Sequence, residues 1–190
     1  MTPEQARRVL EEAELVCDAA AVDRAIRRMA TEITGALGER NPLLVVVMHG
    51  GIYLAGQILP LLGFPLDLDY VHVSRYGDAI RGSELRWKAG PTQSVKGRAV
   101  LVLDDVLDVG HTLAAVRERL LASGAESVHC AVLTEKETGS PKPLRPDFVG
   151  LKLPNRYVFG CGMDVKGAWH NLPEIFALQE IPLGDADKGL

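Results

Sequence analysis

Three aspartates near the middle of the chain stand just before a glycine-rich turn. Asp104 and Asp105 follow the apolar run 99–103, and Asp108 comes three residues later. Residues 110–112, Gly-His-Thr, then begin a stretch with apolar residues at helical spacing. Free N–H groups at a helix start bind phosphate, and carboxylates accept hydrogen bonds from sugar hydroxyls or hold Mg²⁺. These residue types in this order predict a site for a sugar phosphate with Mg²⁺.

Two other interpretations of this stretch are less favoured. It matches neither G-x-x-x-x-G-K-[ST] nor G-x-G-x-x-G, so the main sequence signal for a nucleoside triphosphate or a dinucleotide ligand is absent from this stretch. A solvated acidic loop after a strand is the simplest alternative. The unbroken apolar run before the acids argues against it, because such a run is typical of a strand buried on both faces of a parallel sheet.

A second glycine turn, residues 49–51, His-Gly-Gly, follows the apolar run 43–48 and precedes a helical pattern. By the same reasoning it is a candidate anion-binding corner. Turns of this kind are common and often only structural, so this signal is weak by itself.

The elements that must position these turns alternate along the chain. Apolar runs predict buried strands at 43–48, 66–73, 99–103 and 127–133. Helical patterns follow Thr2, Asp18, Gly51 and Gly110, and residues 14–17 form a small edge strand. This order predicts an α/β fold with a central, mostly parallel sheet flanked by helices. Ligands of such sheets bind at the carboxyl ends of the strands, where both glycine turns stand.

Composition excludes several classes of protein. The 190 residues fit one domain, with 47% hydrophobic and 24% charged residues. A net charge of −4 without runs of like charge argues against nucleic acid as a partner. The run 43–48 is too short to span a bilayer, and the N-terminal residues lack an apolar signal core. We therefore expect no membrane partner and a cytoplasmic protein, and the three cysteines should be reduced thiols.

The run 102–113 resembles the 5-phosphoribosyl 1-pyrophosphate (PRPP) signature of the type I phosphoribosyltransferases. Its three aspartates are similar to those of the hypoxanthine-guanine branch, and the likeness extends from about Leu15 to about Leu178. It implies one domain over 1–190, with a core at about 18–150 and a small hood from about 1–17 and 151–190. It also implies transfer of ribose 5-phosphate from PRPP to N9 of hypoxanthine or guanine, with Mg²⁺, by a homodimer or homotetramer.

The resemblance also implies roles around PRPP. Asp104 and Asp105 would hold the ribose hydroxyls, and Asp108 would be the catalytic proton acceptor at purine N7. The ribose 5′-phosphate would bind to the loop formed by Asp108, Val109, Gly110, His111 and Thr112. Pyrophosphate would bind to His49, Gly50, Gly51 and His170, with a strained or cis Met48–His49 peptide.

A purine-recognition segment is implied at 155–164. Lys136 would donate to the 6-oxo group, Tyr157 would stack on the base, and the Val158 backbone would read its edge. Arg156 belongs to the same segment, and Asp164, together with Asp104, would bind Mg²⁺.

The polar stretch Ser74 to Gly97 is long for a loop and rich in glycine. The resemblance implies a mobile lid here, with Arg75 and Tyr76, that closes over the reacting centre and excludes water. A plain flexible hairpin is the alternative.

Several positions depart from the family pattern on the pyrophosphate side. His49 replaces a lysine, Ser140 and His170 replace arginines, and Val109 and His111 replace a threonine and a basic residue. We expect protonated His49 and His170, with Mg²⁺, to hold pyrophosphate, so that PRPP affinity falls between about pH 6 and 8. Neutral histidines that only donate hydrogen bonds are nearly as well supported.

Two rival functions stay open. A xanthine-preferring transferase would share the motifs, because guanine, hypoxanthine and xanthine differ only at C2. A non-catalytic PRPP-sensing regulator would need a basic face or an added DNA-binding domain, and we expect neither here.

Overall fold

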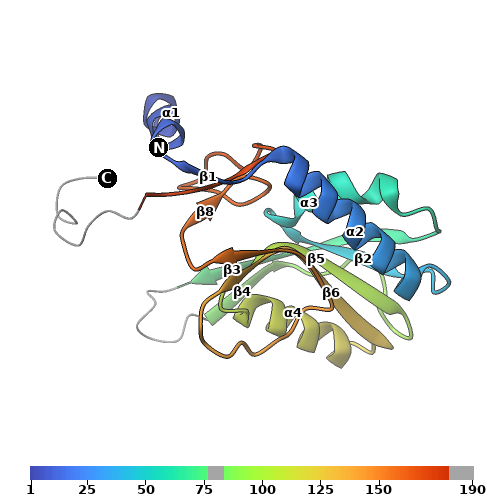
Figure 1. Cartoon of the computed structure of the whole chain (residues 1–190). Helices are drawn as coiled ribbons and strands as arrows, with labels where there is room; N and C mark the ends of the chain where they lie inside the picture. The colour runs from blue at the N-terminus through green and yellow to red at the C-terminus, as the bar shows by residue number, and fades with distance from the viewer. Residues whose placement is uncertain (77–83, 180–190) are drawn as a thin grey trace.

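A computed structural model describes residues 1–76 and 84–179 of the chain. Its centre is a six-stranded sheet in the order β4-β3-β2-β5-β6-β7 (Figure 1). All neighbouring strands are parallel except the β3–β4 pair, which confirms the mostly parallel α/β sheet. The strands are β2 Leu43–Met48, β3 Asp67–Tyr76, β4 Glu84–Ala89, β5 Ala99–Leu107, β6 Ser127–Glu137 and β7 Phe148–Pro154.

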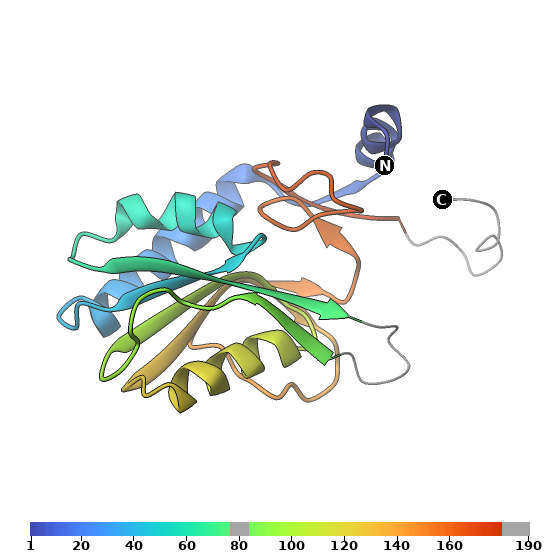
Figure 2. The same ribbon diagram turned by 180° about the vertical axis from the view of Figure 1, so that it is seen from behind.

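Helices cover both faces of the sheet. Helix α2, Ala19–Leu37, and helix α3, Gly51–Ile58, lie on one face, and helix α4, His111–Ala122, lies on the other (Figures 1 and 2). A short 3-10 turn, η1, Leu59–Leu61, follows α3. Within the described ranges, no helix is long and apolar enough to cross a membrane.

Helix α2 forms where the sequence predicts it. The Asp18 carboxylate accepts a hydrogen bond from the Ala21 amide at 2.7 Å, which caps the first turn. The apolar side chains that recur at helical spacing are all buried against the sheet: Val22, Ile26, Met29, Ala30, Ile33 and Leu37. Burial of each large apolar side chain contributes about 1.5–3 kcal/mol, so this face fixes α2 on the sheet.

Strand β5 is longer than predicted. Residues 100–103 are fully buried, which confirms a strand covered on both faces. Pairing with β6 continues through Leu107 and Glu135, so Asp104 and Asp105 lie within the strand and not after it. Backbone hydrogen bonds carry the ladder past the point where the side chains become polar, and apolar patterning does not reveal such an extension.

A second, smaller sheet forms the hood. Its strand order is β1-β9-β8, with β1 Glu14–Cys17, β8 Val158–Phe159 and β9 Ile175–Ala177. Helix α1, Pro3–Glu11, begins at a capping box formed by Thr2 and Gln5, and its Ala6 carbonyl accepts a hydrogen bond from Trp169 Nε1 at 2.8 Å. The hood thus combines the N- and C-terminal segments beyond one end of the core sheet (Figure 1). The core sheet itself continues to Pro154, past residue 150.

The stretch 74–97 is not the long loop that its composition predicts. Strand β3 continues to Tyr76, and β4 pairs with it antiparallel. In β4, Leu85 and Trp87 alternate with exposed residues and pack against the core, and the Arg119 guanidinium lies 4.1 Å from the Trp87 ring. This alternation was masked by the surrounding polar residues. Residues 77–83 and the side chains of Arg75 and Tyr76 lie outside the described part, so the lid interpretation stays a prediction.

Candidate active site

A cavity of about 340 Å³ lies at the carboxyl ends of β2 and β5 and at the start of α4. Six residues from the predicted motifs line it: Gly50, Asp104, Asp105, Asp108, Gly110 and Thr112. The fold therefore brings the two glycine turns and the three acids together, although more than fifty residues separate Gly50 from Asp104 in the sequence. A methyl group on Gly51 would lie 2.7 Å from the Leu103 carbonyl oxygen, so the two strands meet there without room for a side chain.

The start of α4 forms the phosphate end of this cavity. Gly110 has a φ of 86°, a left-handed conformation that glycine adopts without strain, and no side chain caps the helix. The first N–H groups of a helix have no partner within it, and the helix dipole makes this end positive. Val109 is exposed beside the turn. The geometry suits a phosphate monoester held by backbone amides.

The aspartate pair lies where a charge is costly. Asp104 is 8% exposed, and one of its oxygens accepts a hydrogen bond from the Asp105 amide at 3.0 Å. Burial, together with the charge of Asp105 and a hydrogen bond to it, raises the pKa of Asp104 well above its usual range. Burial also raises the pKa of Asp105. A cation or a pair of sugar hydroxyls beside these carboxyl groups would offset the cost of ionising them.

Asp108 and Lys136 form an ion pair with 3.0 Å between Oδ2 and Nζ. Asp108 lies between β5 and α4, and Lys136 lies near the end of β6, which extends four residues further than its apolar run predicts. The Lys136 side chain is 12% exposed and that of Asp108 is 46% exposed. A largely buried ammonium thus lies directly beside a more accessible carboxylate at the edge of the sheet.

The turn after β2 carries more basic groups than the sequence indicated. The Met48–His49 peptide is cis, as the resemblance implied. The His49 ring lies 4.7 Å from the ring of His72 on β3, and Lys88 Nζ on β4 lies 3.4 Å from His72 Nε2. Burial, followed by Lys88 and His49, lowers the pKa of His72. His72 and Lys88 were missed because strand pairing, which aligns Met48 with His72, is not visible in the sequence.

The hood packs directly on this turn. A methyl group on Gly162 would lie 2.1 Å from the Gly50 carbonyl oxygen, and one on Gly50 would lie 2.0 Å from an Asp105 carboxylate oxygen. His170 Nδ1 lies 2.6 Å from the Gly162 carbonyl oxygen, which it can approach only as a donor. His170 also helps to stabilise the charged form of Asp105. The predicted pyrophosphate residues are therefore connected through Gly162.

In the purine segment, some side chains are exposed and others are buried or already bonded within the hood. Tyr157 is 52% exposed and its hydroxyl donates to the Asp164 carbonyl at 3.1 Å, whereas Val158 is buried in β8. Arg156 pairs with Glu14 at 2.6 Å and donates to the Leu178 carbonyl at 3.0 Å. These contacts join parts of the hood, so the guanidinium is already engaged, and a purine contact by Arg156 stays a prediction.

The predicted metal ligands do not form a closed site. Among residues 1–76 and 84–179, no three His, Cys, Asp or Glu side chains are arranged to hold a metal ion. One Asp164 oxygen accepts a hydrogen bond from the Gly167 amide at 2.6 Å. Mg²⁺ is commonly bound by one or two carboxylates together with substrate phosphates. The acids at 104 and 105 fit that mode because a cation would offset the cost of ionising them.

The fold and the cavity are suited to a sugar phosphate bound at the end of a parallel sheet. The sequence profile of the phosphoribosyl transferase domain matches residues 16–166. The chain therefore belongs to the phosphoribosyltransferase family.

Named relatives cover most of the chain. It is 30% identical over 160 residues to the hypoxanthine-guanine phosphoribosyltransferase of Streptococcus pneumoniae, a match that spans 84% of this chain and 89% of the relative. It is 29% identical to the hypoxanthine-guanine-xanthine phosphoribosyltransferase of Tritrichomonas foetus, over 84% and 87% of the two chains. A solved hypoxanthine-guanine-xanthine phosphoribosyltransferase superposes with a TM-score of 0.77 at 26% identity, over 90% of this chain and 97% of that one. A hypoxanthine phosphoribosyltransferase from Staphylococcus aureus superposes with a TM-score of 0.83 at 22% identity, over 89% and 93% of the two chains, which supports the fold.

Proposed function

We propose that the protein is a purine-salvage enzyme that transfers ribose 5-phosphate from PRPP to N9 of hypoxanthine or guanine. The observation that carries this proposal is the ion pair between Lys136 and Asp108 beside the phosphate turn. On a 6-oxopurine, O6 is an acceptor and the neighbouring N7 can carry a proton. An ammonium 3.0 Å from a carboxylate matches that edge, with Lys136 at O6 and Asp108 at N7. Adenine presents a donor at C6, which Lys136 would disfavour.

The sugar phosphate occupies the cavity beside this pair. The amides at 109–112 hold the 5′-phosphate, and the carboxyl groups of Asp104 and Asp105 accept hydrogen bonds from the ribose hydroxyls. A lid that carries Arg75 and Tyr76, as the resemblance implies, would exclude water from the reacting centre.

In the reaction, N9 forms a bond to ribose C1 while the bond from C1 to the pyrophosphate oxygen breaks. Positive charge develops on the sugar and negative charge on the leaving group. Asp108 accepts the proton from N7, and a positioned general base of this kind accelerates a reaction by roughly 10²–10⁴-fold.

The leaving pyrophosphate binds to the turn of His49, Gly50 and Gly51 and to His170, and His72 and Lys88 stand beside it. Asp104 and Asp164 would hold Mg²⁺, which supplies charge neutralisation to the pyrophosphate when it is bound.

We propose further that the chain forms a homodimer or homotetramer. Leu68 and Tyr70, which lie on the same face of β3, are 51% and 41% exposed, and Ile52 of α3 is 50% exposed. Exposed apolar side chains of this size are typical of interaction surfaces when they gather on one face. Multi-angle light scattering should give a multiple of 20.6 kDa, and a monomer at micromolar concentration would exclude this part of the proposal.

A spectrophotometric assay with PRPP, Mg²⁺ and one of five bases tests the function. Hypoxanthine and guanine should give IMP and GMP, whereas adenine and orotate should give no nucleotide. Xanthine is included because the T. foetus relative is named for three bases. Turnover of orotate or adenine alone, or of no base at all, would contradict the proposal.

A further inference from the structure

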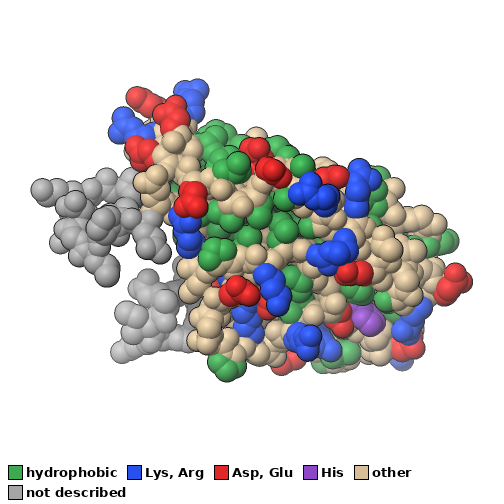
Figure 3. Space-filling model, viewed as in Figure 1, with side chains coloured by type: hydrophobic (Ala, Val, Ile, Leu, Met, Phe, Trp, Pro, Cys, Tyr) green, Lys and Arg blue, Asp and Glu red, His purple; other side chains and the backbone are tan. Residues whose placement is uncertain are grey.

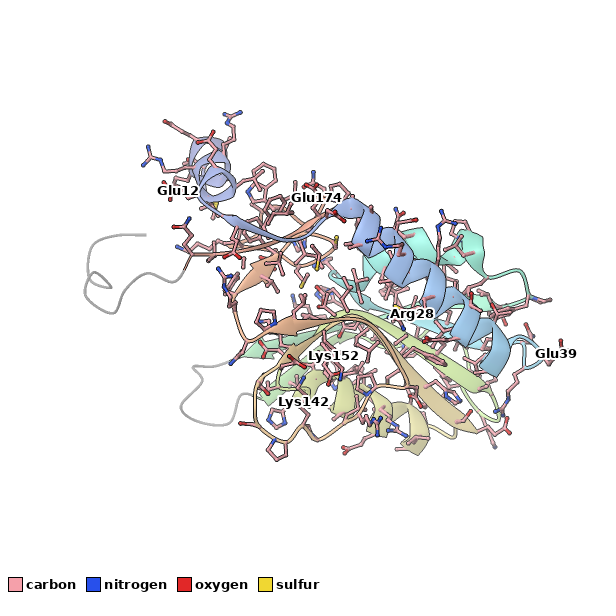
Figure 4. The ribbon with its side chains drawn as sticks, viewed as in Figure 1. Glu12, Arg28, Glu39, Lys142, Lys152 and Glu174 are labelled. Carbon is pink, nitrogen blue, oxygen red and sulfur yellow. The ribbon has the colours of Figure 1, made fainter. Side chains whose placement is uncertain are left out.

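Lys142 lies in the loop between β6 and β7, with only 11% of its side chain exposed (Figure 4). Its ammonium contacts three acceptors: the Lys136 carbonyl at 2.5 Å, the Leu107 carbonyl at 3.3 Å and a Glu135 carboxylate oxygen at 3.3 Å. An ammonium has three N–H donors, so these contacts use all of them. Nothing in the sequence distinguished Lys142 from other loop lysines.

These acceptors mark the end of the β5–β6 ladder. Leu107 and Glu135 are the last pair of residues in register between β5 and β6. Asp108 directly follows Leu107, and Lys136 directly follows Glu135. The Leu107 carbonyl belongs to the peptide group that joins Leu107 to Asp108. Lys142 therefore fixes the backbone at Lys136 and immediately before Asp108, and bridges the two strands where their pairing ends.

We infer that Lys142 is a positioning residue for purine recognition, an inference that rests on the proposed function. In the structure, Asp108 and Lys136 bind each other. A purine must separate them, and their own contact then no longer sets the distance between them. The hydrogen bonds from Lys142 to the Leu107 and Lys136 carbonyls keep the Asp108 carboxylate and the Lys136 ammonium within reach of N7 and O6. Lys142 itself acts through these residues and not on the base.

The alternative is that Lys142 only anchors the loop between β6 and β7. The two roles differ in which ligand they affect. Ribose 5-phosphate uses the phosphate turn and the acids, whereas GMP adds the base that Asp108 and Lys136 contact. A positioning role therefore predicts a loss confined to the ligand that carries a base.

The experiment is isothermal titration calorimetry of Lys142→Met with GMP and with ribose 5-phosphate. The Kd for GMP should rise about tenfold, whereas the Kd for ribose 5-phosphate should stay within about twofold of the wild-type value. The kcat should fall roughly 10–100-fold, because small displacements of positioned groups have effects of this size. Lys152→Met is the matched control: Lys152 is an exposed residue of β7 that lines the same surface cavity as Lys142 (Figure 4), and both Kd values should match those of the wild type.

Each result decides the inference. An unchanged Kd for GMP in Lys142→Met, or equal losses for both ligands, would overturn it in favour of loop anchoring. If the methionine variant does not fold, Lys142→Gln, whose amide keeps two N–H donors, is titrated in the same way and judged by the same criterion. Failure of the proposed function is seen separately, because wild-type protein would then bind GMP no more tightly than ribose 5-phosphate.

Discussion

At the scale of single residues, Asp108 carries the strongest functional assignment. Asp108→Asn keeps the size of the side chain but cannot accept a proton, so kcat should fall roughly 10²–10⁴-fold. The backbone amides that hold the 5′-phosphate are unaffected, so the Kd for PRPP should change little. Steady-state kinetics and calorimetry on the same preparation check both numbers. An unchanged kcat would remove the general-base role.

Asp104 illustrates how an active-site carboxylate costs stability. Its folded-state pKa is raised by burial, so folding favours the protonated form. Below the usual carboxyl pKa of about 4, both folded and unfolded states are protonated and no cost arises. As the pH rises above it, the unfolded state ionises freely and the free energy of unfolding of the wild type falls.

Asp104→Asn should therefore be more stable than the wild type at pH 7 but inactive. Asparagine keeps an acceptor for the Asp105 amide and carries no charge. We expect a gain of about 0.5–2 kcal/mol, or about 2–4 °C in Tm per kcal/mol, that disappears near pH 4. Thermal unfolding in EDTA between about pH 4 and 8 measures it. A lower Tm for the variant at pH 7 would show that the carboxylate is stabilised in the folded protein.

The predictability of the site also differs from residue to residue. Asp104, Asp105 and Asp108 stand out because they lie within five residues of the sequence that follow an apolar run. The pairing of Asp108 with Lys136, the cluster of His49, His72 and Lys88, and the contacts of Lys142 depend on which strands are neighbours. Spacing along the chain does not contain that information, so these contacts required the structure.

At the scale of elements, the hood and the turn after β2 are fitted through glycines. Gly162 has a φ of 101° and packs on the Gly50 carbonyl, whereas Gly167 has a φ of 84° and nothing within 4 Å of its added methyl group. Both alanine variants should suffer backbone strain of about 1–3 kcal/mol. Only Gly162→Ala should also displace the turn and reduce kcat/KM at least about tenfold. Equal activity of the two variants would contradict a tight contact between hood and turn.

The elements themselves were largely predictable. Helix caps at Thr2 and Asp18 and the unbroken apolar runs at 43–48 and 99–103 determine local structure through short-range contacts, and the structure has them at those positions. The 74–97 stretch was predicted wrongly because β4 is a short strand at the edge of the sheet, and its alternation of apolar and polar residues stands within a long polar segment. The extra length of β5 and β6 likewise depends on each strand having the other as a partner.

At the scale of the whole molecule, the core sheet and the hood are two sheets of different size. Charged side chains of both signs are spread over the face shown in Figure 3, which agrees with a net charge of only −4. Arg156 joins the beginning and the end of the hood through Glu14 and the Leu178 carbonyl. We propose that the hood can open while the core stays folded.

Arg156→Met tests this division. The variant should lose about 1–3 kcal/mol in the hood, and hydrogen exchange should accelerate for amides of β1 and β9 but not for those of β2 and β5. Glu14→Gln removes only the exposed carboxylate of this ion pair and should cost less than about 1 kcal/mol. Equal acceleration in both sheets would mean that hood and core unfold as one unit.

The most direct test of the central claim is a crystal structure of the protein with bound GMP. The phosphate should lie on the backbone amides at 109–112, the ribose hydroxyls beside Asp104 and Asp105, and O6 and N7 of guanine between Lys136 and Asp108. A phosphate bound elsewhere, or a guanine edge that contacts neither Lys136 nor Asp108, would contradict the account.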